Sequence, residues 1–390
     1  MIELENALHV VLGTAAVLKA ENVVLQQSLG RVLAEDVFSD TDMPPFNKSA
    51  VDGYACRRAD LAGDLEVIET IPAGHNPSKI IATGTCSKIM TGSPVPEGAD
   101  IVIMVEDTQE TGQNRIRFVR EKSGSNICLK AEDVKQGQLV LPKGTLIRPQ
   151  EMAVMASVGC TNPLVSMKPV VGIISTGDEL VEPNETPKFS QIRNSNATQL
   201  MAQVMRAGAT PEYFGIARDS RESTHNLVSL ALTKCDVVLL TGGVSMGDFD
   251  FVPGVLKDLG IDLLFESVAV QPGRPTIFGT GNGKYLFGLP GNPVSSFVQF
   301  ELLVKPLLFA IMGHQFKPVM FTLPMAQAYL RRNTKRKSLL PVVIRENKVY
   351  PVEYHGSAHI HSYIFAEGIV AVEIGKMGIE TGELVNVRQI

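Results

Sequence analysis

Five carboxylates follow apolar segments in the second half of the chain, each where a β-strand is expected to end. They are Asp178, Glu179, Asp219, Asp248 and Asp250. In an open parallel sheet the carboxyl ends of the strands share one edge, and ligands bind along that edge. Such oxygen ligands suit Mg²⁺, which keeps several waters and bridges phosphates. Any single member could equally be a turn former or a helix cap, so the hypothesis of a magnesium site depends on the cluster.

Three of the apolar segments run directly into loops of small residues. The loop residues that we expect to face a ligand are Thr176, Gly242, Gly243, Ser245, Pro290, Gly291, Asn292, Pro293 and Ser295. Strands that end in glycine before a helix leave backbone N–H groups facing one crevice, where anions bind. The pattern predicts a site for a phosphorylated or oxyanion ligand.

A fourth loop, from Gln271 through Arg274 to Pro275, follows another apolar segment. Its arginine can donate bidentate hydrogen bonds to an oxyanion, although one loop arginine is more often a solvated charge.

The C-terminal part holds three histidines at metal-ligand spacing, but no thiolate or carboxylate completes a set. We interpret these histidines as surface or packing residues: His355, His359 and His361.

Composition and missing motifs exclude several classes of function. The net charge of −5 disfavours general binding to nucleic acid, which needs clustered positive charge. The five cysteines are far apart and form no C-x-x-C pair, as expected for reduced thiols in the cytoplasm. Neither a leader pattern nor an apolar run of the roughly 20 residues of a membrane span is visible. We therefore expect a cytoplasmic protein that binds neither nucleic acid nor a membrane.

Changes of pattern along the chain predict a multidomain α/β protein with four modules. Strand-like and helical segments alternate over residues 167–313, which is typical of a mostly parallel, three-layer α/β domain. Residues 44–133 contain short strand-like pieces and predict an inserted small β domain. The flanking residues 1–43 and 134–166 are expected to form one discontinuous, elongated α+β linker and dimerisation module. Residues 314–390 indicate a C-terminal all-β domain of barrel-like form.

Five motifs resemble, in order and spacing, those of the molybdopterin molybdenumtransferases, which are the MoeA and gephyrin E-domain family. The motifs are PPFNKSAVDGY (44–54), TGSPVPEGAD (91–100), STGDEL (175–180), GGVSMGD (242–248) and GLPGNPVS (288–295). The resemblance covers essentially the whole chain, including the inserted β domain and the β tail. As a set, these motifs are specific to that family.

The resemblance implies the last step of molybdenum cofactor synthesis. In that step adenylyl-molybdopterin is hydrolysed, molybdate is inserted into the dithiolene, and AMP leaves, with Mg²⁺ assisting. The implied catalytic carboxylates are Asp52, Asp133, Glu179, Asp219 and Asp250, of which Asp219 and Asp250 match the magnesium positions. Further substrate contacts are implied at Thr91, Pro290, Pro293 and Ser357.

The resemblance also implies partners. Family members are homodimers in which the β domain of one subunit completes the cleft of the other. The upstream adenylyl transferase of the same pathway and molybdoenzyme chaperones are implied as further partners. Adenylyl transferases share the α/β module but lack the inserted β domain and the β tail.

Two positions depart from the family pattern at the molybdate pocket. Many members carry Lys-Pro-Gly-Lys-Pro where this chain has Gln271 and Arg274, and Pro341 aligns with an arginine of that pocket. Losing two cations would weaken oxyanion binding by on the order of 10²- to 10⁴-fold. We therefore expect weak molybdate binding, or recruitment of Arg336 or Arg345 in their place.

Two alternatives to molybdate insertion follow from the sequence. Gln271 and Pro341 leave open a divergent paralogue that handles tungstate or another form of the cofactor. A non-catalytic dimeric scaffold, like the gephyrin E domain, is the second alternative. Gephyrin carries an additional N-terminal domain and a long linker, whereas this sequence starts at the first helix of the shared region, which disfavours the scaffold.

Overall fold

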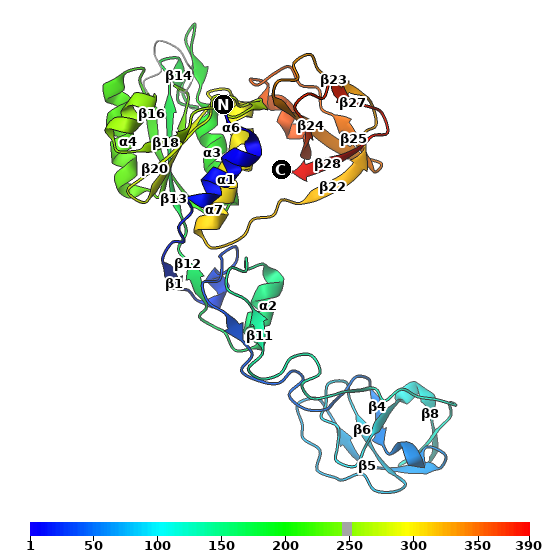
Figure 1. Ribbon diagram of the computed structural model, residues 1–390. Coiled ribbons are helices and arrows are strands. Elements are labelled where there is room, and N and C mark those ends of the chain that lie inside the picture. Colours follow the sequence, from blue (N-terminus) through cyan, green and yellow to red (C-terminus); the bar gives the residue numbers. More distant parts are fainter. Residues whose placement is uncertain (244–251) are drawn as a thin grey trace.

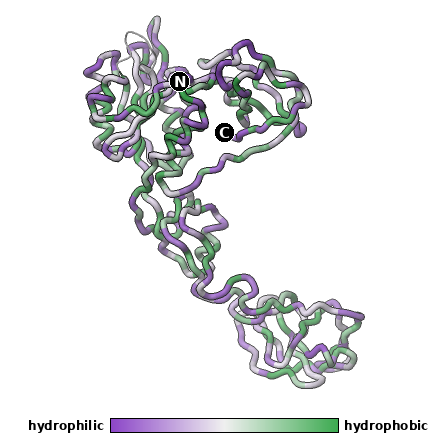
Figure 2. The backbone as a smooth tube through the Cα atoms, in the orientation of Figure 1, coloured by the Kyte–Doolittle hydropathy of each residue, from purple (hydrophilic) through white to green (hydrophobic). Residues whose placement is uncertain are grey.

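The computed structural model describes residues 1–243 and 252–390. Its parts are arranged along an elongated molecule, shown in Figure 1. An α/β domain and a C-terminal β domain lie side by side at one end. A slender module connects them to a small β domain at the other end. The two chain segments that lead into this small domain are mainly hydrophilic (Figure 2).

A six-stranded sheet forms the centre of the α/β domain. Its strands are β13 (Val170–Thr176), β16 (Thr210–Ala217), β17 (Val237–Thr241), β18 (Asp262–Phe265), β20 (Ile277–Gly281) and β21 (Lys284–Leu289). The order is β16-β13-β17-β21-β20-β18, in which the first four strands pair in parallel and β20 pairs antiparallel with both β21 and β18. The expectation of a mostly parallel α/β sheet is confirmed.

Helices cover both faces of this sheet. One layer contains α1 (Leu4–Gly13), α3 (Ser195–Arg206), α6 (Pro293–Gln299) and α7 (Lys305–Ile311), and the other contains α4 (Arg221–Lys234) and α5 (Val252–Asp258). Successive residues of β17 point to opposite layers, so Leu239 packs in the first core and Leu240 in the second. A strand buried on both faces must be apolar throughout, which explains the unbroken VVLL segment.

The helix after β21 is long and strongly apolar. The run Pro293–Ile311 joins α6 to α7 through a π-helical turn at Phe300–Val304. Its 19 residues have the length and apolarity of a membrane span, but 83% of the apolar window is buried inside the protein. This run is therefore a core helix of the α/β domain.

The slender module is built from two separate stretches of chain. Its elements are β1 (Ala20–Asn22), β2 (Val37–Phe38), β11 (Leu139–Leu141), α2 (Pro149–Ser157) and β12 (Leu164–Ser166). Strand β1 pairs antiparallel with β12, and β2 pairs antiparallel with β11. The small hydrophobic core of the module includes the buried side chains of Leu33, Ile147 and Met155. The chain therefore passes through this module twice.

Two further six-stranded sheets make up the β domains. The small domain contains β4 (Gly53–Cys56), β5 (Asp64–Ile71), β6 (Thr85–Ile89), β7 (Ile101–Met104), β8 (Thr108–Gly112) and β9 (Arg115–Phe118), with β3 (Lys48–Ser49) and β10 (Ile127–Cys128) paired beside them. The C-terminal domain contributes five strands to its sheet: β22 (Met320–Pro324), β24 (Lys337–Arg345), β25 (Lys348–Pro351), β26 (Gly368–Val372) and β28 (Leu384–Gln389). The sixth strand of this sheet comes from the α/β segment, and the pair β23 (Tyr329–Leu330) and β27 (Gly378–Ile379) lies in the same domain.

The structure differs from the expected domain boundaries at two places. Helix α1 packs against α7 of the α/β domain, not within the slender module, because Ala7 and Val11 are buried in the α/β core. The apolar segment at residues 262–270, within the expected α/β domain, forms two strands and not one. Its end, β19 (Val270–Gln271), leaves the α/β sheet and pairs in parallel with β24 of the C-terminal sheet.

A buried carboxylate ties several helices and the C-terminal strand together. Glu301, in the π-helical turn, is 1% exposed and contacts Arg206 at 2.5 Å and Lys305 at 2.9 Å. Burial alone would raise the pKa of Glu301, but Lys305, Arg206 and Gln203 together hold it below its ordinary value. Arg388 of β28 donates to the Glu301 carbonyl oxygen at 2.6 Å. The network therefore stabilises the contact of the helix layer with the C-terminal domain.

Replacing Glu301 with glutamine should destabilise the fold by about 2 kcal/mol, because Lys305 and Arg206 lose the charge-assisted hydrogen bonds that they make to the carboxylate. The folded-state pKa of Glu301 is lowered, so its contribution is complete above the ordinary glutamate pKa of about 4.3. The contribution disappears as the pH falls through the folded-state pKa. Urea unfolding near neutral pH and at about pH 3.5 measures the difference.

The control for this experiment is Glu212→Gln, which removes an exposed ion pair with Lys234. Its expected change in unfolding free energy is within about 0.5 kcal/mol. Equal destabilisation by the two substitutions would contradict the stabilising role of the Glu301 network.

Candidate functional site

Two cavities meet at the loop between β21 and α6. One, of about 810 Å³, lies at the carboxyl ends of β13, β17 and β21, and we call it the strand-end cavity. The other, of about 770 Å³, lies between the α/β and C-terminal domains, and we call it the interdomain cavity. Pro275, Pro290 and Asn292 line both cavities. A ligand that occupied both would pass over this shared wall.

Side-chain hydrogen bonds hold the wall of the strand-end cavity. Asn196, at the start of α3, donates to the Thr241 hydroxyl and to the Gly291 carbonyl oxygen, both at 2.7 Å. The Thr241 hydroxyl donates in turn to the Pro290 carbonyl oxygen at 3.2 Å. Asn196 is not among the site residues predicted from the sequence. A polar residue in the first turn of a helix that follows a strand-end loop is the pattern that would have indicated it.

Glycines allow two strand-end loops to approach each other closely. Gly242 has φ of +93°, and a Cβ atom there would lie 2.6 Å from the Thr176 carbonyl oxygen. Gly243, with φ of +62°, follows it and also lines the cavity. Left-handed backbone and close approach both require glycine at Gly242. The structure thus brings Thr176, Gly242 and Gly243 together at one cavity, as the sequence predicted.

Two of the five predicted strand-end carboxylates line this cavity. Glu179 and Asp219 are lining residues. Asp178 makes two reciprocal hydrogen bonds with Asp219 instead. The backbone N–H of Asp219 donates to Asp178 Oδ1 at 3.3 Å, and the backbone N–H of Asp178 donates to Asp219 Oδ2 at 3.2 Å. The other two predicted carboxylates, Asp248 and Asp250, lie outside the described ranges, as does the predicted loop residue Ser245.

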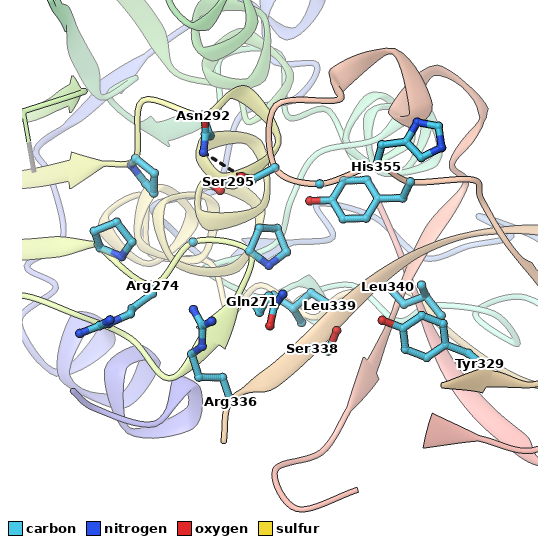
Figure 3. Close-up of a pocket in the computed structure, with 17 residues that line it drawn as sticks. Gln271, Arg274, Asn292, Ser295, Tyr329, Arg336, Ser338, Leu339, Leu340 and His355 are labelled. Carbon is cyan, nitrogen blue, oxygen red and sulfur yellow. Dashed lines mark hydrogen bonds between the residues drawn. The ribbon is translucent and has the colours of Figure 1, made fainter. Parts of the chain in front are cut away.

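The interdomain cavity has a basic character. Arg274 reaches it from the loop after β19, and Arg336 reaches it from the residue before β24 (Figure 3). Neutral donors complete the lining, including Ser295, Ser338 and Ser357. Within residues 1–243 and 252–390, no aspartate or glutamate lines this cavity. Such a set of groups favours an anionic ligand.

Asn292 connects the two domains at the cavity. Its side-chain amide donates to the Ser357 hydroxyl at 2.7 Å, drawn as a dashed line in Figure 3. The backbone N–H of Val294 donates to the Ser357 carbonyl oxygen at 3.1 Å. The predicted residues Pro290, Gly291, Asn292, Pro293, Ser295 and Ser357 therefore lie together, although they come from two domains.

The loop Gln271–Pro275 lies over a buried amide. Gly273 has φ of +104°, and a Cβ atom there would lie 2.3 Å from Gln299 Nε2. Gln299, at the end of α6, is fully buried, and neither its Nε2 nor its Oε1 has a hydrogen-bond partner among the described residues. The absence of a side chain at Gly273 allows the loop to pass this close to α6, and the loop carries Gln271, Arg274 and Pro275 with it.

Two positions that the sequence connected with the oxyanion pocket lie away from the interdomain cavity. Pro341 is buried in the middle of β24, opposite Ile369, and does not line the interdomain cavity. Arg345, at the end of β24, lines a different cavity together with His359 and His361. Of the two arginines that could replace the missing cations, the fold places Arg336 at the cavity.

The predicted residues of the small β domain lie far from both cavities within one chain. Asp52 accepts hydrogen bonds from the Thr91 N–H at 2.7 Å and from its hydroxyl at 2.8 Å. These two bonds lower the pKa of Asp52, so this exposed group is ionised at neutral pH. Asp133 is exposed near the junction with the slender module. Figure 1 shows this domain at the opposite end of the molecule from the α/β domain.

Comparisons with known proteins agree with this architecture. Three family models match in order: "MoeA N-terminal region (domain I and II)" at residues 2–159, "Probable molybdopterin binding domain" at 172–310 and "MoeA C-terminal region (domain IV)" at 325–390. A crystal structure of the molybdopterin biosynthesis moeA protein from Pyrococcus horikoshii OT3 matches with a TM-score of 0.87 and 31% identity, covering 100% of both chains.

Curated relatives agree over nearly the full length. The molybdopterin molybdenumtransferase of Bacillus subtilis is 37% identical over 388 residues, which are 95% of this chain and 89% of that protein. The one from Staphylococcus epidermidis is 34% identical over 397 residues, covering 99% of this chain and 95% of that protein. The resemblance inferred from the motifs is confirmed. The chain belongs to the MoeA family of molybdopterin molybdenumtransferases.

Proposed function

We propose that this protein hydrolyses adenylyl-molybdopterin and inserts molybdate into its dithiolene, releasing AMP and molybdenum cofactor. The observation that carries the proposal is the pair of adjoining cavities with a common wall at Pro290 and Asn292. One cavity has strand ends and backbone donors suited to phosphate groups. The other has two arginines and hydroxyl groups suited to a metal oxyanion. Non-catalytic scaffolding would not require this pairing of sites.

Mg²⁺ is part of the proposal. Glu179 and Asp219 offer oxygen ligands at the strand-end cavity, where a phosphate group would bind. Over residues 1–243 and 252–390, no group of three or more His, Cys, Asp or Glu residues converges as a metal cage. Two carboxylates fit Mg²⁺, which retains waters and commonly binds through one or two carboxylates plus phosphate. When bound, the ion would neutralise phosphate charge.

The remaining residues would bind and orient the substrate. Thr176, Gly242 and Gly243 would contact the anionic groups at the strand ends. Asn292, through its hydrogen bond to Ser357, would keep the two cavities in a fixed position relative to each other. Arg274 would bind the oxyanion at the far side of the wall. Holding molybdate next to the pterin sulfurs in this way lowers the entropic cost of the transfer.

The direct test is incubation of the protein with adenylyl-molybdopterin, Mg²⁺ and either molybdate or tungstate, following AMP release. We expect release with molybdate and strong dependence on Mg²⁺. Faster release with tungstate would instead support the tungstate paralogue. Absence of AMP release with either anion would contradict the proposed reaction.

A homodimer is the second part of the proposal, because Asp52 and Thr91 lie far from both cavities of their own chain. We expect Asp52→Ala and Asp219→Ala to be inactive separately. After mixing and subunit exchange, heterodimers would have one site with both residues intact, so about a quarter of all sites would be active. Recovery of AMP release measures this complementation.

A mixture that stays as inactive as its components, although exchange has occurred, would show that each site uses one chain. Mixing two preparations that both carry Asp219→Ala, differently tagged, controls for exchange without complementation.

Substitution of Gly273 tests the loop over Gln299. Gly273→Ala should reduce the kcat/KM for AMP release by about 10- to 100-fold, since strain and contact with Gln299 displace the loop and Arg274. The additional substitution Gln299→Ala should restore part of this loss by making room for the Cβ atom. The matched control is Gly283→Ala, which has φ of +73° but no neighbour within 4 Å. Equal losses for both glycines would refute the contact with Gln299.

A further inference from the structure

A short pair of strands forms part of the wall of the strand-end cavity. Strands β14 (Leu180–Val181) and β15 (Ile192–Arg193) pair in parallel, and a loop connects them. We call residues 180–193 the arm. In Figure 1 β14 is labelled at the end of the α/β domain away from the slender module. Both strands line the strand-end cavity, and Glu179, one of the proposed Mg²⁺ ligands, directly precedes the arm.

The pairing within the arm is short. Each strand has two residues, and an isolated pair of strands is at best marginally stable in water. Backbone hydrogen bonds link its ends, from the Ile192 N–H to the Glu179 carbonyl oxygen at 2.9 Å and from the Asn194 N–H to the Val181 carbonyl oxygen at 2.8 Å. The arm therefore needs contacts from outside its own pairing to stay in place.

The hydroxyl of Tyr213 provides such contacts. It donates to Glu182 Oε1 at 2.8 Å and accepts from the side-chain amide of Asn194 at 2.9 Å. Glu182 directly follows β14 and Asn194 directly follows β15, so one hydroxyl connects the ends of both strands. We call this arrangement the hydroxyl bridge. Burial and the hydrogen bond to Glu182 raise the pKa of Tyr213, so the hydroxyl keeps the proton that it donates.

The hydroxyl bridge is anchored in the core of the α/β domain. Tyr213 lies in β16, which pairs with β13 in the central sheet. The side-chain oxygen of Asn194, which is 2% exposed, accepts from the Ser175 hydroxyl at 3.0 Å and from the Ala197 N–H at 3.3 Å. These contacts tie the arm to the end of β13 and to the first turn of α3. The loop from β13 to β14, which carries Glu179, is therefore held at both ends.

The carboxylate of Glu179 has a close neighbour within this loop. A Cβ atom at Gly177, which has φ of +141°, would lie 2.3 Å from Glu179 Oε2. Gly177 and Glu179 both line the strand-end cavity. Because the Ile192 N–H bonds to the Glu179 carbonyl oxygen, an outward movement of the arm would draw Glu179 away from this position.

We propose that Tyr213 is a positioning residue for Mg²⁺ binding, because its hydroxyl holds the arm through Glu182 and Asn194 and so keeps Glu179 at the strand-end cavity. The inference rests on the proposed function, in which Glu179 is a ligand of Mg²⁺. Tyr213 is not one of the described residues that line this cavity. It acts on the metal only through the arm.

Hydrogen exchange tests the hydroxyl bridge directly. Tyr213→Phe removes the hydroxyl and keeps the ring, which leaves the buried amide of Asn194 without its partner. Amide exchange in peptides from residues 180–194, followed by mass spectrometry, should become about 10-fold faster because the arm opens more often.

The matched control is Tyr285→Phe. The Tyr285 hydroxyl also makes two hydrogen bonds, donating to the Thr14 carbonyl oxygen at 3.0 Å and accepting from the Ala16 N–H at 2.8 Å. It lies near the start of β21, whereas the strand-end cavity is at the other end of that strand. Exchange in residues 180–194 should therefore equal that of the unmodified protein.

The Mg²⁺ dependence of AMP release tests the effect on Glu179. Tyr213→Phe should raise the Mg²⁺ concentration for half-maximal AMP release by about 10-fold, as expected when a residue that supports a metal ligand is lost. The kcat at saturating Mg²⁺ should change little, since the bound ion itself draws Glu179 back to the cavity. Tyr285→Phe should leave the Mg²⁺ requirement unchanged.

Substitutions at Glu182 identify the contact that matters. Glu182→Ala should shift exchange and Mg²⁺ dependence in the same direction as Tyr213→Phe. The double variant should match Tyr213→Phe alone, because both substitutions remove the same hydrogen bond. Glu182→Gln should keep most of the protection, since its amide oxygen can still accept from Tyr213.

The outcomes distinguish this inference from the proposed function. Unchanged exchange in Tyr213→Phe, or equal acceleration in Tyr285→Phe, would overturn the hydroxyl bridge. Faster exchange with an unchanged Mg²⁺ requirement would overturn the positioning of Glu179 and leave the proposed function intact. If the unmodified protein releases no AMP, the proposed function fails and the positioning of Glu179 for Mg²⁺ fails with it, while hydrogen exchange still decides whether Tyr213 holds the arm.

Discussion

The short parallel pairing between β19 and β24 determines the geometry of the whole site. Two residues of the α/β segment, Val270 and Gln271, leave their own sheet and join the sheet of the C-terminal domain. Because main-chain hydrogen bonds fix register, this pairing places the loop after β19 directly opposite the start of β24. The interdomain cavity, with one arginine from each side, is the consequence of that register.

The core beneath the site supports the same arrangement. Glu301 joins α3, α7 and β28 through the ion pairs of its buried carboxylate and through a backbone contact, so the helix that follows the Pro290–Pro293 loop is tied to both domains. Gln299, two residues earlier in the chain, carries a buried amide directly below Gly273. Glu301 belongs to the π-helical turn that begins directly after Gln299, and such turns are common near functional sites. The loops at both cavities therefore rest on one rigid helix.

The elongated shape explains why the acidic and hydroxyl groups of the small β domain require a partner in the proposed mechanism. The chain crosses the slender module twice, which keeps the small domain at a distance from the cavities. Asp52 is nevertheless preorganised by Thr91, whose two hydrogen bonds favour the ionised carboxylate. A preformed anion on an exposed surface suits an approach to the cleft of a second subunit.

Much of the architecture follows from the sequence, because its signals are local. The apolar strands, the glycine-rich loops and the proline loop have fixed spacing, so the α/β sheet, its strand-end cavity and the family were all predictable from residues such as Gly242 and Pro290. Local pattern could not show that α1 packs on the α/β core or that β19 changes sheets. Nor could it show which groups Asn196 would bind, because these partners lie 45 and 95 residues away in the sequence.

The cations of the oxyanion cavity illustrate the same division. The sequence by itself determined that Gln271 and Pro341 lack charge and that Arg336 and Arg345 were available in their place. Only the tertiary structure decided between the two arginines. Arg336 precedes the ladder with β19, whereas Arg345 lies at the other end of β24 and faces another cavity. Strand pairing between distant segments makes this choice, and no local pattern of residue types encodes which segments will pair.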